Sequence, residues 1–209
     1  MYRVNEIFYS LQGEGFWTGT PMVFVRLSGC NLQCPFCDTD HRAFKRMSAD
    51  EILKEVRRLD RKAQRDNPWW DDCGHVCITG GEPLIQLDAP LIEVLHHADY
   101  MIHVETNGTL PVPPLVDWVT LSPKEDFVPN AKVVLEEVQE VKLLFDGTLS
   151  DESLEYWADF PAKWHFLQPC DVGDPVKSRA ILKQTVDYVK SHGAIWRLSL
   201  QTHKLLGIR

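Results

Sequence analysis

The segment Gly29–Thr39, GCNLQCPFCDT, carries the pattern that decides the fold of this chain. It holds Cys30, Cys34 and Cys37 in the spacing C-x3-C-x2-C, which lets three thiols fold around one soft metal centre. Iron–sulfur clusters are normally held by four thiolates, so three thiolates leave one iron open. An open ligand position is where metal chemistry takes place, as in catalytic zinc sites. The segment predicts a cluster with one open iron; a three-cysteine zinc site and three free thiols are the alternatives.

Around this segment, short β-rich runs alternate with amphipathic helical stretches, which predicts an α/β fold with a largely parallel sheet. The expected strands are Val4–Tyr9, Met22–Leu27, His75–Thr79, Met101–Glu105, Trp118–Leu121, Val138–Phe145, Trp164–Leu167 and Trp196–Leu200. The expected later helices are Ala89–Ala98, Asp151–Trp157 and Lys177–Ser191. The first helix is expected to begin after Ser48, an N-cap with Glu51 as its capping-box partner. The polar segment Arg61–Asp72 is expected to be a surface loop.

Polar or glycine-rich turns follow five of the expected strands. They are the cysteine segment, Gly80–Pro83, Thr106–Gly108, Ser122–Lys124 and Gln168–Pro169. Functional residues of parallel α/β folds gather at the carboxyl ends of the strands, so we expect these turns to share one mouth. Each turn alone is weak support, because the loops that follow strands are usually polar.

Composition limits the classes of protein to which this chain can belong. The 209 residues, 44% hydrophobic and 25% charged, are typical of a globular protein and predict a single domain over residues 1–209. A net charge of −8 without a basic stripe argues against nucleic acid as a partner. The sequence shows no signal peptide and no apolar run long enough to span a membrane, so we expect a cytoplasmic protein. The six cysteines are then expected to be thiols and ligands.

Two of these motifs together resemble the radical S-adenosylmethionine (SAM) superfamily: GCNLQCPFCDT and TGGEP (Thr79–Pro83). Glycines in such a turn allow close approach of a ligand to the backbone. The resemblance implies a [4Fe-4S] cluster whose open iron chelates SAM and whose reduced form cleaves SAM to a 5′-deoxyadenosyl radical.

A narrower resemblance, to the 7-carboxy-7-deazaguanine synthases, extends from Glu6 to Lys204. It is carried by Glu6–Gly15, Cys37–Thr39, Val104–Gly108, Leu121–Lys124, Leu167–Pro169 and Leu200–Lys204. This family implies a small, incomplete TIM-type barrel that uses SAM and Mg²⁺. It implies conversion of 6-carboxy-5,6,7,8-tetrahydropterin to 7-carboxy-7-deazaguanine with release of ammonia, towards queuosine and other 7-deazapurines. It also implies a homodimer and a flavodoxin-like or other electron donor.

The resemblance assigns roles to individual residues. The cluster ligands would be Cys30, Cys34 and Cys37, and Thr39 would offer its hydroxyl to Mg²⁺. SAM would contact Phe36, Cys37, Asp38, Gly81, Glu105, Ser122, Pro123, Lys124, Gln168, Pro169, Cys170 and Asp171. The substrate would contact Leu11, Gln12, Gly13, Glu14, Arg26, Thr79, His203 and Arg209. Glu105 and His203 are the candidates for a catalytic role.

Other interpretations of these residues remain open. Arg26 could be a surface strand arginine and Thr39 a turn residue, while Glu105 and His203 could be ordinary surface side chains. A glycyl-radical-enzyme activase shares the cysteine spacing, and a non-catalytic zinc- or cluster-binding module is the alternative from another class. The opening QGEG and the ending Gln-Thr-His favour the small-molecule synthase over the activase.

A second C-x3-C pair is formed by Cys73 and Cys77. Cys77 falls inside an expected strand, and no third ligand follows nearby. We therefore expect both to be ordinary thiols.

Overall fold

The computed structural model describes residues 1–37, 40, 43–66 and 74–209, without the side chains of residues 64–66. Within these residues nine strands form a single sheet in the order β3-β1-β2-β4-β5-β6-β7-β8-β9. Their bounds are β1 Tyr2–Leu11, β2 Pro21–Leu27, β3 Lys45–Met47, β4 His75–Gly80, β5 Met101–Thr106, β6 Trp118–Leu121, β7 Val138–Phe145, β8 Ala162–Pro169 and β9 Trp196–Leu198. β1 runs antiparallel to β2 and β3, and all the other neighbours are parallel. The predicted α/β class with a mostly parallel sheet is confirmed.

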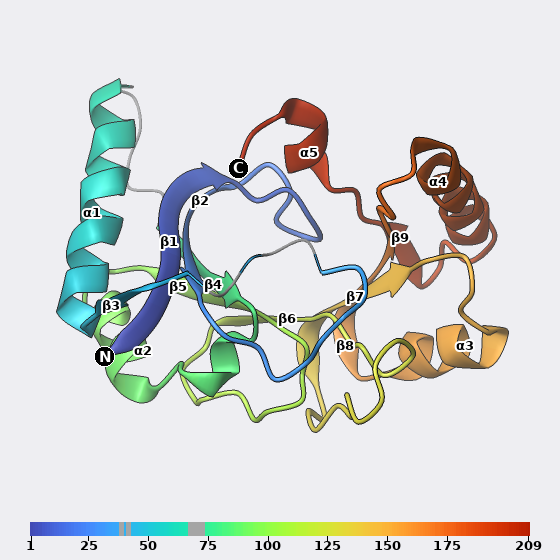
Figure 1. The fold of residues 1–209 in the computed structure, drawn as a ribbon, viewed down its shortest axis with the longest axis horizontal. Helices are drawn as coiled ribbons and strands as arrows, with labels where there is room; N and C mark the ends of the chain where they lie inside the picture. Colours follow the sequence, from blue (N-terminus) through green and yellow to red (C-terminus); the bar gives the residue numbers. More distant parts are fainter. Residues whose placement is uncertain (38–39, 41–42, 67–73) are drawn as a thin grey trace.

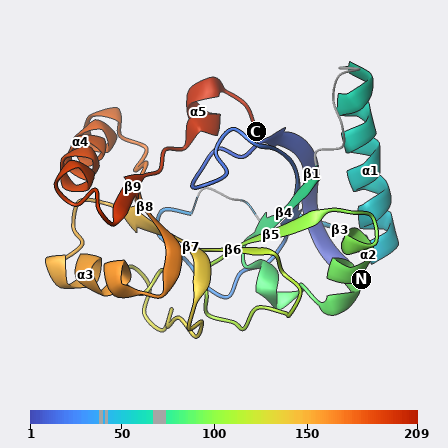
Figure 2. The ribbon, with the colours of Figure 1, turned by 180° about the vertical axis from the view of Figure 1, so that it is seen from behind.

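The sheet curves into a barrel that does not close, because β3 and β9 stand at opposite ends of the strand order (Figure 1). The helices α1 (Ala49–Asp66) and α2 (Ala89–His96) lie outside one part of the barrel, and α3 (Asp151–Asp159) and α4 (Pro175–Ser191) lie outside the other (Figures 1 and 2). The predicted small, incomplete barrel is thereby confirmed.

Two apolar clusters hold these helices against the sheet. Val25, Ile78 and Leu91 belong to the cluster beneath α1 and α2 and are fully buried. Leu143 and Trp157 belong to the cluster beneath α3 and α4. Burial of apolar area is the main favourable contribution to folding, at about 25 cal/mol per Å². The inner face of the sheet is therefore left free to carry polar side chains.

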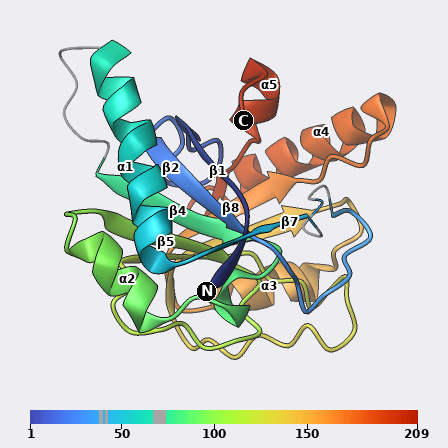
Figure 3. The same cartoon turned by 60° about the vertical axis from the view of Figure 1, so that its left-hand side comes forward.

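The C-terminal segment crosses the open side of the barrel. The short helix α5 (Thr202–Leu206) lies between the β1–β2 side and the α4–β9 side (Figures 1 and 3). The backbone N–H of Thr202 donates to the carbonyl oxygen of Gly13 at 2.9 Å. The segment between β1 and β2 and the end of the chain therefore face each other.

The start of α1 has the predicted capping box. The N–H of Glu51 donates to Ser48 Oγ at 3.2 Å, and the N–H of Ser48 donates to Glu51 Oε2 at 2.7 Å. The exchange satisfies two backbone donors that a helix start leaves without partners.

Several details of the sequence-based prediction were wrong. The expected surface loop Arg61–Asp72 is helical as far as Asp66, because RKAQRD contains good helix formers and no breaker. The rest of that loop lies outside the described residues. Two short elements, β3 and α5, were missed, because a few residues give too little periodicity to read. The expected strands are all present, although β9 ends at Leu198 and not at Leu200.

Gly80 pairs with Leu27 at the end of the β2–β4 ladder. It has φ of +149°, and a Cβ built on it would lie 2.1 Å from the carbonyl oxygen of Leu27. That contact is with backbone of the paired strand, which cannot move aside without breaking the β2–β4 ladder. Only glycine fits this position.

Replacing Gly80 by alanine should therefore destabilise the protein by at least about 2 kcal/mol, through a strained backbone and a backbone clash. Gly173→Ala is the matched control, because Gly173 also has a positive φ, +72°, but a Cβ there meets nothing within 4 Å. The control should cost only about 1 kcal/mol. Chemical denaturation of both variants measures the difference, and equal losses would contradict the account of Gly80.

Candidate active site

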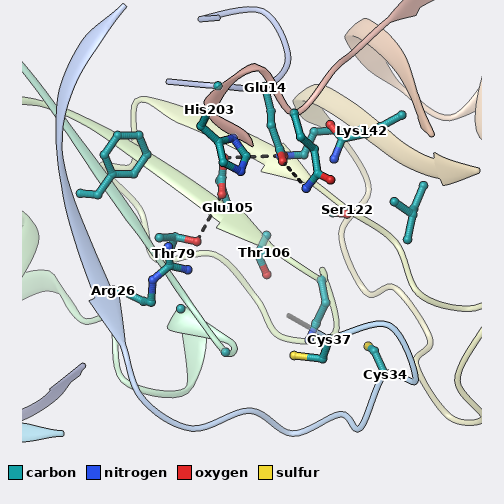
Figure 4. Close-up of a pocket in the computed structure, with 18 of the residues that line it drawn as sticks. Glu14, Arg26, Cys34, Cys37, Thr79, Glu105, Thr106, Ser122, Lys142 and His203 are labelled. Carbon is teal, nitrogen blue, oxygen red and sulfur yellow. Dashed lines mark hydrogen bonds and ion pairs between the residues drawn. The ribbon is translucent and has the colours of Figure 1, made fainter. Parts of the chain in front are cut away.

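The inner face of the barrel encloses a cavity of about 500 Å³. All five polar turns expected to share a mouth contribute to its lining, through Cys30, Gly81, Asn107, Ser122 and Gln168. The positions of these turns in the amino-acid sequence thus predicted where the cavity lies. Figure 4 shows Cys34 and Cys37 at one end of the cavity and Glu14, Lys142 and His203 at the other. We call these the thiol end and the charged end.

Several contacts position the loop of the thiol end. Cys30 and Cys34 are half-buried, and Cys37 is exposed. The N–H of Cys37 donates to the carbonyl oxygen of Cys34 at 3.2 Å, which curls the loop. The side-chain amide of Asn107 donates to Asn31 Oδ1 at 3.1 Å, which ties the loop to the end of β5. The ring of Phe36 packs edge-on against Phe127 with centroids 5.0 Å apart.

Burial and neighbouring charges shift the pKa of two of the three thiols. Burial is the largest cause that raises the pKa of both Cys30 and Cys34. The charge of Lys124 acts in the opposite direction on the pKa of Cys34. Burial lowers the pKa of Lys124 to about 8, and its Nζ donates to the carbonyl oxygen and the hydroxyl of Ser122, both at 2.6 Å. A cation therefore faces the thiol end from the loop after β6.

The arrangement of the three thiols fits a group larger than a single ion. Among the residues that the structure describes, no three His, Cys, Asp or Glu side chains are grouped so that they could hold one metal ion. Zinc requires each thiolate at about 2.3 Å, which brings the sulfur atoms close together. Thiolates on an iron–sulfur cluster bind different irons and stand further apart. Three thiolates that leave one iron open are the donor set that such a cluster needs.

A buried carboxylate ties the glycine turn to the neighbouring strand. Glu82 is fully buried and accepts three hydrogen bonds, from Leu84 N at 2.9 Å, Thr106 Oγ1 at 2.8 Å and Asn107 N at 2.8 Å. Burial raises its pKa. The Glu82 N–H in turn donates to the carbonyl oxygen of Gly29 at 2.9 Å. One residue thus connects the glycine turn, the end of β5 and the cysteine loop.

The charged end is built around three ionisable side chains from separate elements. Lys142 on β7 donates to Glu14 Oε2 at 2.5 Å and lies 3.4 Å from Glu105 Oε1 on β5. Glu105 also accepts hydrogen bonds from Gln12 Nε2 and Thr79 Oγ1, both at 3.2 Å. These contacts fix two carboxylates and an ammonium on the cavity wall.

Arg26 and the end of the chain complete this part of the cavity. Arg26 Nε donates to Glu6 Oε1 at 3.0 Å, and Arg209 lies 3.0 Å from the other oxygen of Glu6. The imidazole of His203 lies so close to Gly13 that a Cβ on Gly13 would be 2.3 Å from Nδ1. Arg26 is therefore not an isolated surface arginine, and the last residues of the chain border the cavity.

Most of the residues predicted for the site line this one cavity. They are Leu11, Gln12, Gly13, Glu14, Arg26, Cys30, Cys34, Phe36, Cys37, Thr79, Gly81, Glu105, Ser122, Lys124, Gln168, Cys170, Asp171, His203 and Arg209. The cavity lining does not include Pro123 or Pro169, which are described but lie outside it. Asp38 and Thr39, together with Cys73, lie outside the described residues.

Sequence reasoning missed Lys142 and Asn107, which line the cavity, and Glu82, which supports it from behind the lining. Lys142 had a readable signal, since it interrupts the apolar end of the strand VQEVKLLF. Glu82 and Asn107 stand within motifs that were recognised, but their hydrogen bonds to each other join two turns far apart in sequence. Such pairings follow from the sheet order and not from local pattern.

Comparison with known proteins identifies the class to which this fold and site belong. Residues 24–122 match the profile of the Radical SAM superfamily, and this stretch contains both the cysteine loop and the glycine turn. Residues 24–122 are therefore similar to the Radical SAM domain.

Relatives over the full length narrow this assignment. The chain is 44% identical over 209 residues to a 7-carboxy-7-deazaguanine synthase of Bacteroides thetaiotaomicron, covering 100% of both chains. It is 39% identical to the Bordetella pertussis enzyme of that name, with 99% of each chain covered. The crystal structure of QueE from Escherichia coli superimposes with a TM-score of 0.73 at 28% identity, covering 95% of this chain and 93% of that one. This chain belongs to the 7-carboxy-7-deazaguanine synthase family.

The hydrogen bonds of Glu82 predict a stability effect at the glycine turn. Glu82→Ala leaves three buried donors without their acceptor and should destabilise the protein by about 2–4 kcal/mol. Glu93→Ala on the exposed face of α2 is the control and should stay within about 0.5 kcal/mol. Thermal and chemical unfolding measure both variants; a Glu82→Ala variant as stable as the control would show that Glu82 does not hold the turn.

Proposed function

We propose that this chain is a 7-carboxy-7-deazaguanine synthase, a radical SAM enzyme that converts 6-carboxy-5,6,7,8-tetrahydropterin to 7-carboxy-7-deazaguanine with release of ammonia. The observation that carries this proposal is the single cavity with a thiol end and a charged end. A radical formed beside the thiols would meet a polar substrate held by charged side chains. The reaction would serve the biosynthesis of queuosine and other 7-deazapurines.

At the thiol end, Cys30, Cys34 and Cys37 would hold the [4Fe-4S] cluster. When bound, the reduced cluster and SAM supply a 5′-deoxyadenosyl radical. Gly81 lines the cavity beside the thiols. A Cβ there would lie 2.2 Å from the carbonyl oxygen of Gly29, so only glycine lets this turn pack against the cysteine loop, where SAM would bind. Further SAM contacts are proposed for Phe36, Asp38, Glu105, Ser122, Pro123, Lys124, Gln168, Pro169, Cys170 and Asp171. Pro123 and Pro169 are the weakest of these, since neither lines the cavity.

At the charged end, the chain offers acceptors and donors that complement a carboxylated pterin. The ring N–H and amino groups of a pterin form a pair of donors, and a carboxylate such as Glu14 can accept both. Arg26 uses Nε for Glu6, which leaves its terminal nitrogens for the substrate carboxylate. A guanidinium binds a carboxylate through two parallel hydrogen bonds, which a lysine cannot do.

The remaining substrate contacts surround these two residues. They are proposed for Leu11, Gln12, Gly13, Thr79, His203 and Arg209. Glu105 and His203 are proposed for catalysis, because both line the cavity at or near its charged end. Mg²⁺, a hard cation that binds oxygen, would take the hydroxyl of Thr39 together with substrate oxygens and water.

The size of the cavity favours a small molecule over a protein backbone as the substrate. Small-molecule sites usually enclose about 300–1,000 Å³, and this cavity of about 500 Å³ lies inside that range. It therefore supports the synthase over an activase that must admit a polypeptide.

Four further features stay proposals. They are a homodimer, a flavodoxin-like or other electron donor, a cytoplasmic location and a single domain over residues 1–209. None of the five described cysteines forms a disulfide, which suits a reducing compartment. No helix in the described part of the chain is long and apolar enough to cross a membrane. The single sheet of the described residues supports one domain.

Anaerobic reconstitution tests the proposed function. The reconstituted protein should bind four iron atoms and form 7-carboxy-7-deazaguanine and ammonia from the carboxytetrahydropterin, SAM, Mg²⁺ and a reductant. Cys34→Ala should lose the cluster and all turnover, because two thiolates hold a cluster poorly. Cys77→Ala, which changes a buried thiol outside the cavity lining, is the control and should keep its iron. A Cys34→Ala variant with full iron content and turnover would exclude the cluster assignment.

A further inference from the structure

Lys142 is a buried lysine on β7 that the proposed function does not use. Its neighbours Val141 and Leu143 are fully buried, and the Lys142 side chain itself is 7% exposed. Side chains alternate along a strand, so Lys142 points to the face opposite Val141 and Leu143, into the cavity. An ammonium group in such a place is costly unless it is paired and hydrogen-bonded.

The partners of Lys142 complete a closed ring of hydrogen bonds. Lys142 Nζ contacts Glu14 Oε2 and Glu105 Oε1. The side-chain amide of Gln12 donates to Glu105 Oε1 at 3.2 Å, and Gln12 Oε1 accepts from the Glu14 N–H at 3.1 Å. Gln201 Nε2 adds a bond to Glu14 Oε1 at 3.0 Å. The ring joins the loop after β1, strands β5 and β7, and the C-terminal segment (Figure 4).

Lys142 also sets the charge of Glu14. Burial alone would raise the pKa of Glu14, but the ammonium of Lys142 and hydrogen bonds from Lys142, Gln201 and Gln168 outweigh it and lower the pKa to about 2. Burial would lower the pKa of Lys142, but the carboxylates around it outweigh burial and raise it. The other charged or titratable groups facing the ring are Arg26, Cys77, Lys124, Glu140 and His203. Glu14 and Lys142 are thus both charged across the working pH range.

Stability alone does not explain such a group. Replacing a buried ion pair by apolar side chains of similar size is often neutral or stabilising. Burying three charges is therefore not expected to increase the stability of the fold. The ring also lies on the cavity wall, where each of its members can be reached by a ligand. A role in the site accounts for both its position and its energetic cost.

We propose that Lys142 is a positioning residue that keeps Glu14 ionised and fixes Glu14 and Glu105 in place as acceptors for the N–H groups of the substrate. The identity of that substrate rests on the proposed function, whereas the role of Lys142 towards the two carboxylates does not. Without Lys142, Glu14 would be a buried carboxylate with no cation beside it and would take up a proton. A protonated Glu14 presents a donor where the substrate also presents one.

The test compares Lys142→Met with the parent, both as reconstituted holoenzyme. Infrared spectroscopy at pH 7 should show a neutral carboxyl band in Lys142→Met that the parent lacks. Affinity for 6-carboxypterin, followed by its fluorescence, should fall about 10- to 100-fold, the loss expected when a charged acceptor is removed. The loss should shrink as the pH is raised, because a higher pH removes the proton from Glu14 again. Iron content should not change.

Lys183→Met is the matched control. Lys183 makes the same kind of ion pair, with Asp187 at 3.1 Å on the outer face of α4, but its side chain is 81% exposed. This variant should show neither the carboxyl band nor a change in affinity for 6-carboxypterin.

The double variant Lys142→Met/Glu14→Gln separates positioning from a merely structural role. It removes the uncompensated carboxylate, so folding should recover even where Lys142→Met alone is unstable. Its affinity for 6-carboxypterin should stay low, because the ionised acceptor is gone. Recovery of affinity in the double variant, or absence of the infrared band in Lys142→Met, would overturn the inference. A parent that fails to bind 6-carboxypterin would overturn the proposed substrate, and the infrared result would still decide the role of Lys142.

Discussion

The close contact between the glycine turn and the end of β2 is the constraint on which the site depends. Gly81 N donates to the carbonyl oxygen of Leu27 at 3.2 Å, and Glu82 N donates to that of Gly29 at 2.9 Å. A Cβ on Gly81 would lie 2.8 Å from Cβ of Cys30, so side chains in the turn would displace the cysteine loop. Two backbones that touch in this way fix the first cysteine relative to the rest of the barrel.

The second constraint is the burial of charge at the other end of the cavity. Charged groups inside a barrel must find partners there, and here the partners come from β5, β7 and the loop after β1. Because that loop and the C-terminal segment cross the open side of the barrel, the ion pairs also tie down the elements that complete the cavity wall. The ion pairs and hydrogen bonds that stabilise the buried charges thus also define the region where a polar substrate would bind.

The sequence predicted the parts of this structure that depend on local pattern. The cysteine loop, the turns that follow the strands and the capping box at Ser48 all depend on local pattern; the five turns share one cavity as expected, and the capping box is present. The parts that were missed depend on tertiary pairing. The role of Lys142 depends on its contact with Glu14, which lies across the barrel from β7. The strand β3 forms because Lys45–Met47 pairs with the edge of β1. The helical end of α1 was missed because a helix made of polar residues has the composition of a loop.

The central claim is that a radical generated at the thiol end reaches a substrate bound at the charged end. Deuterium transfer tests this most directly. The reconstituted protein would be given 6-carboxy-5,6,7,8-tetrahydropterin deuterated at its ring carbons, together with SAM, Mg²⁺ and a reductant. The conversion of the pterin to 7-carboxy-7-deazaguanine and ammonia is redox-neutral, so the hydrogen atom that the radical takes must be given back, and SAM can re-form. The account therefore predicts that deuterium enters the 5′-carbon of the adenosyl group, in 5′-deoxyadenosine or in SAM, when 7-carboxy-7-deazaguanine is formed. Product formation with no substrate deuterium in either molecule would contradict it.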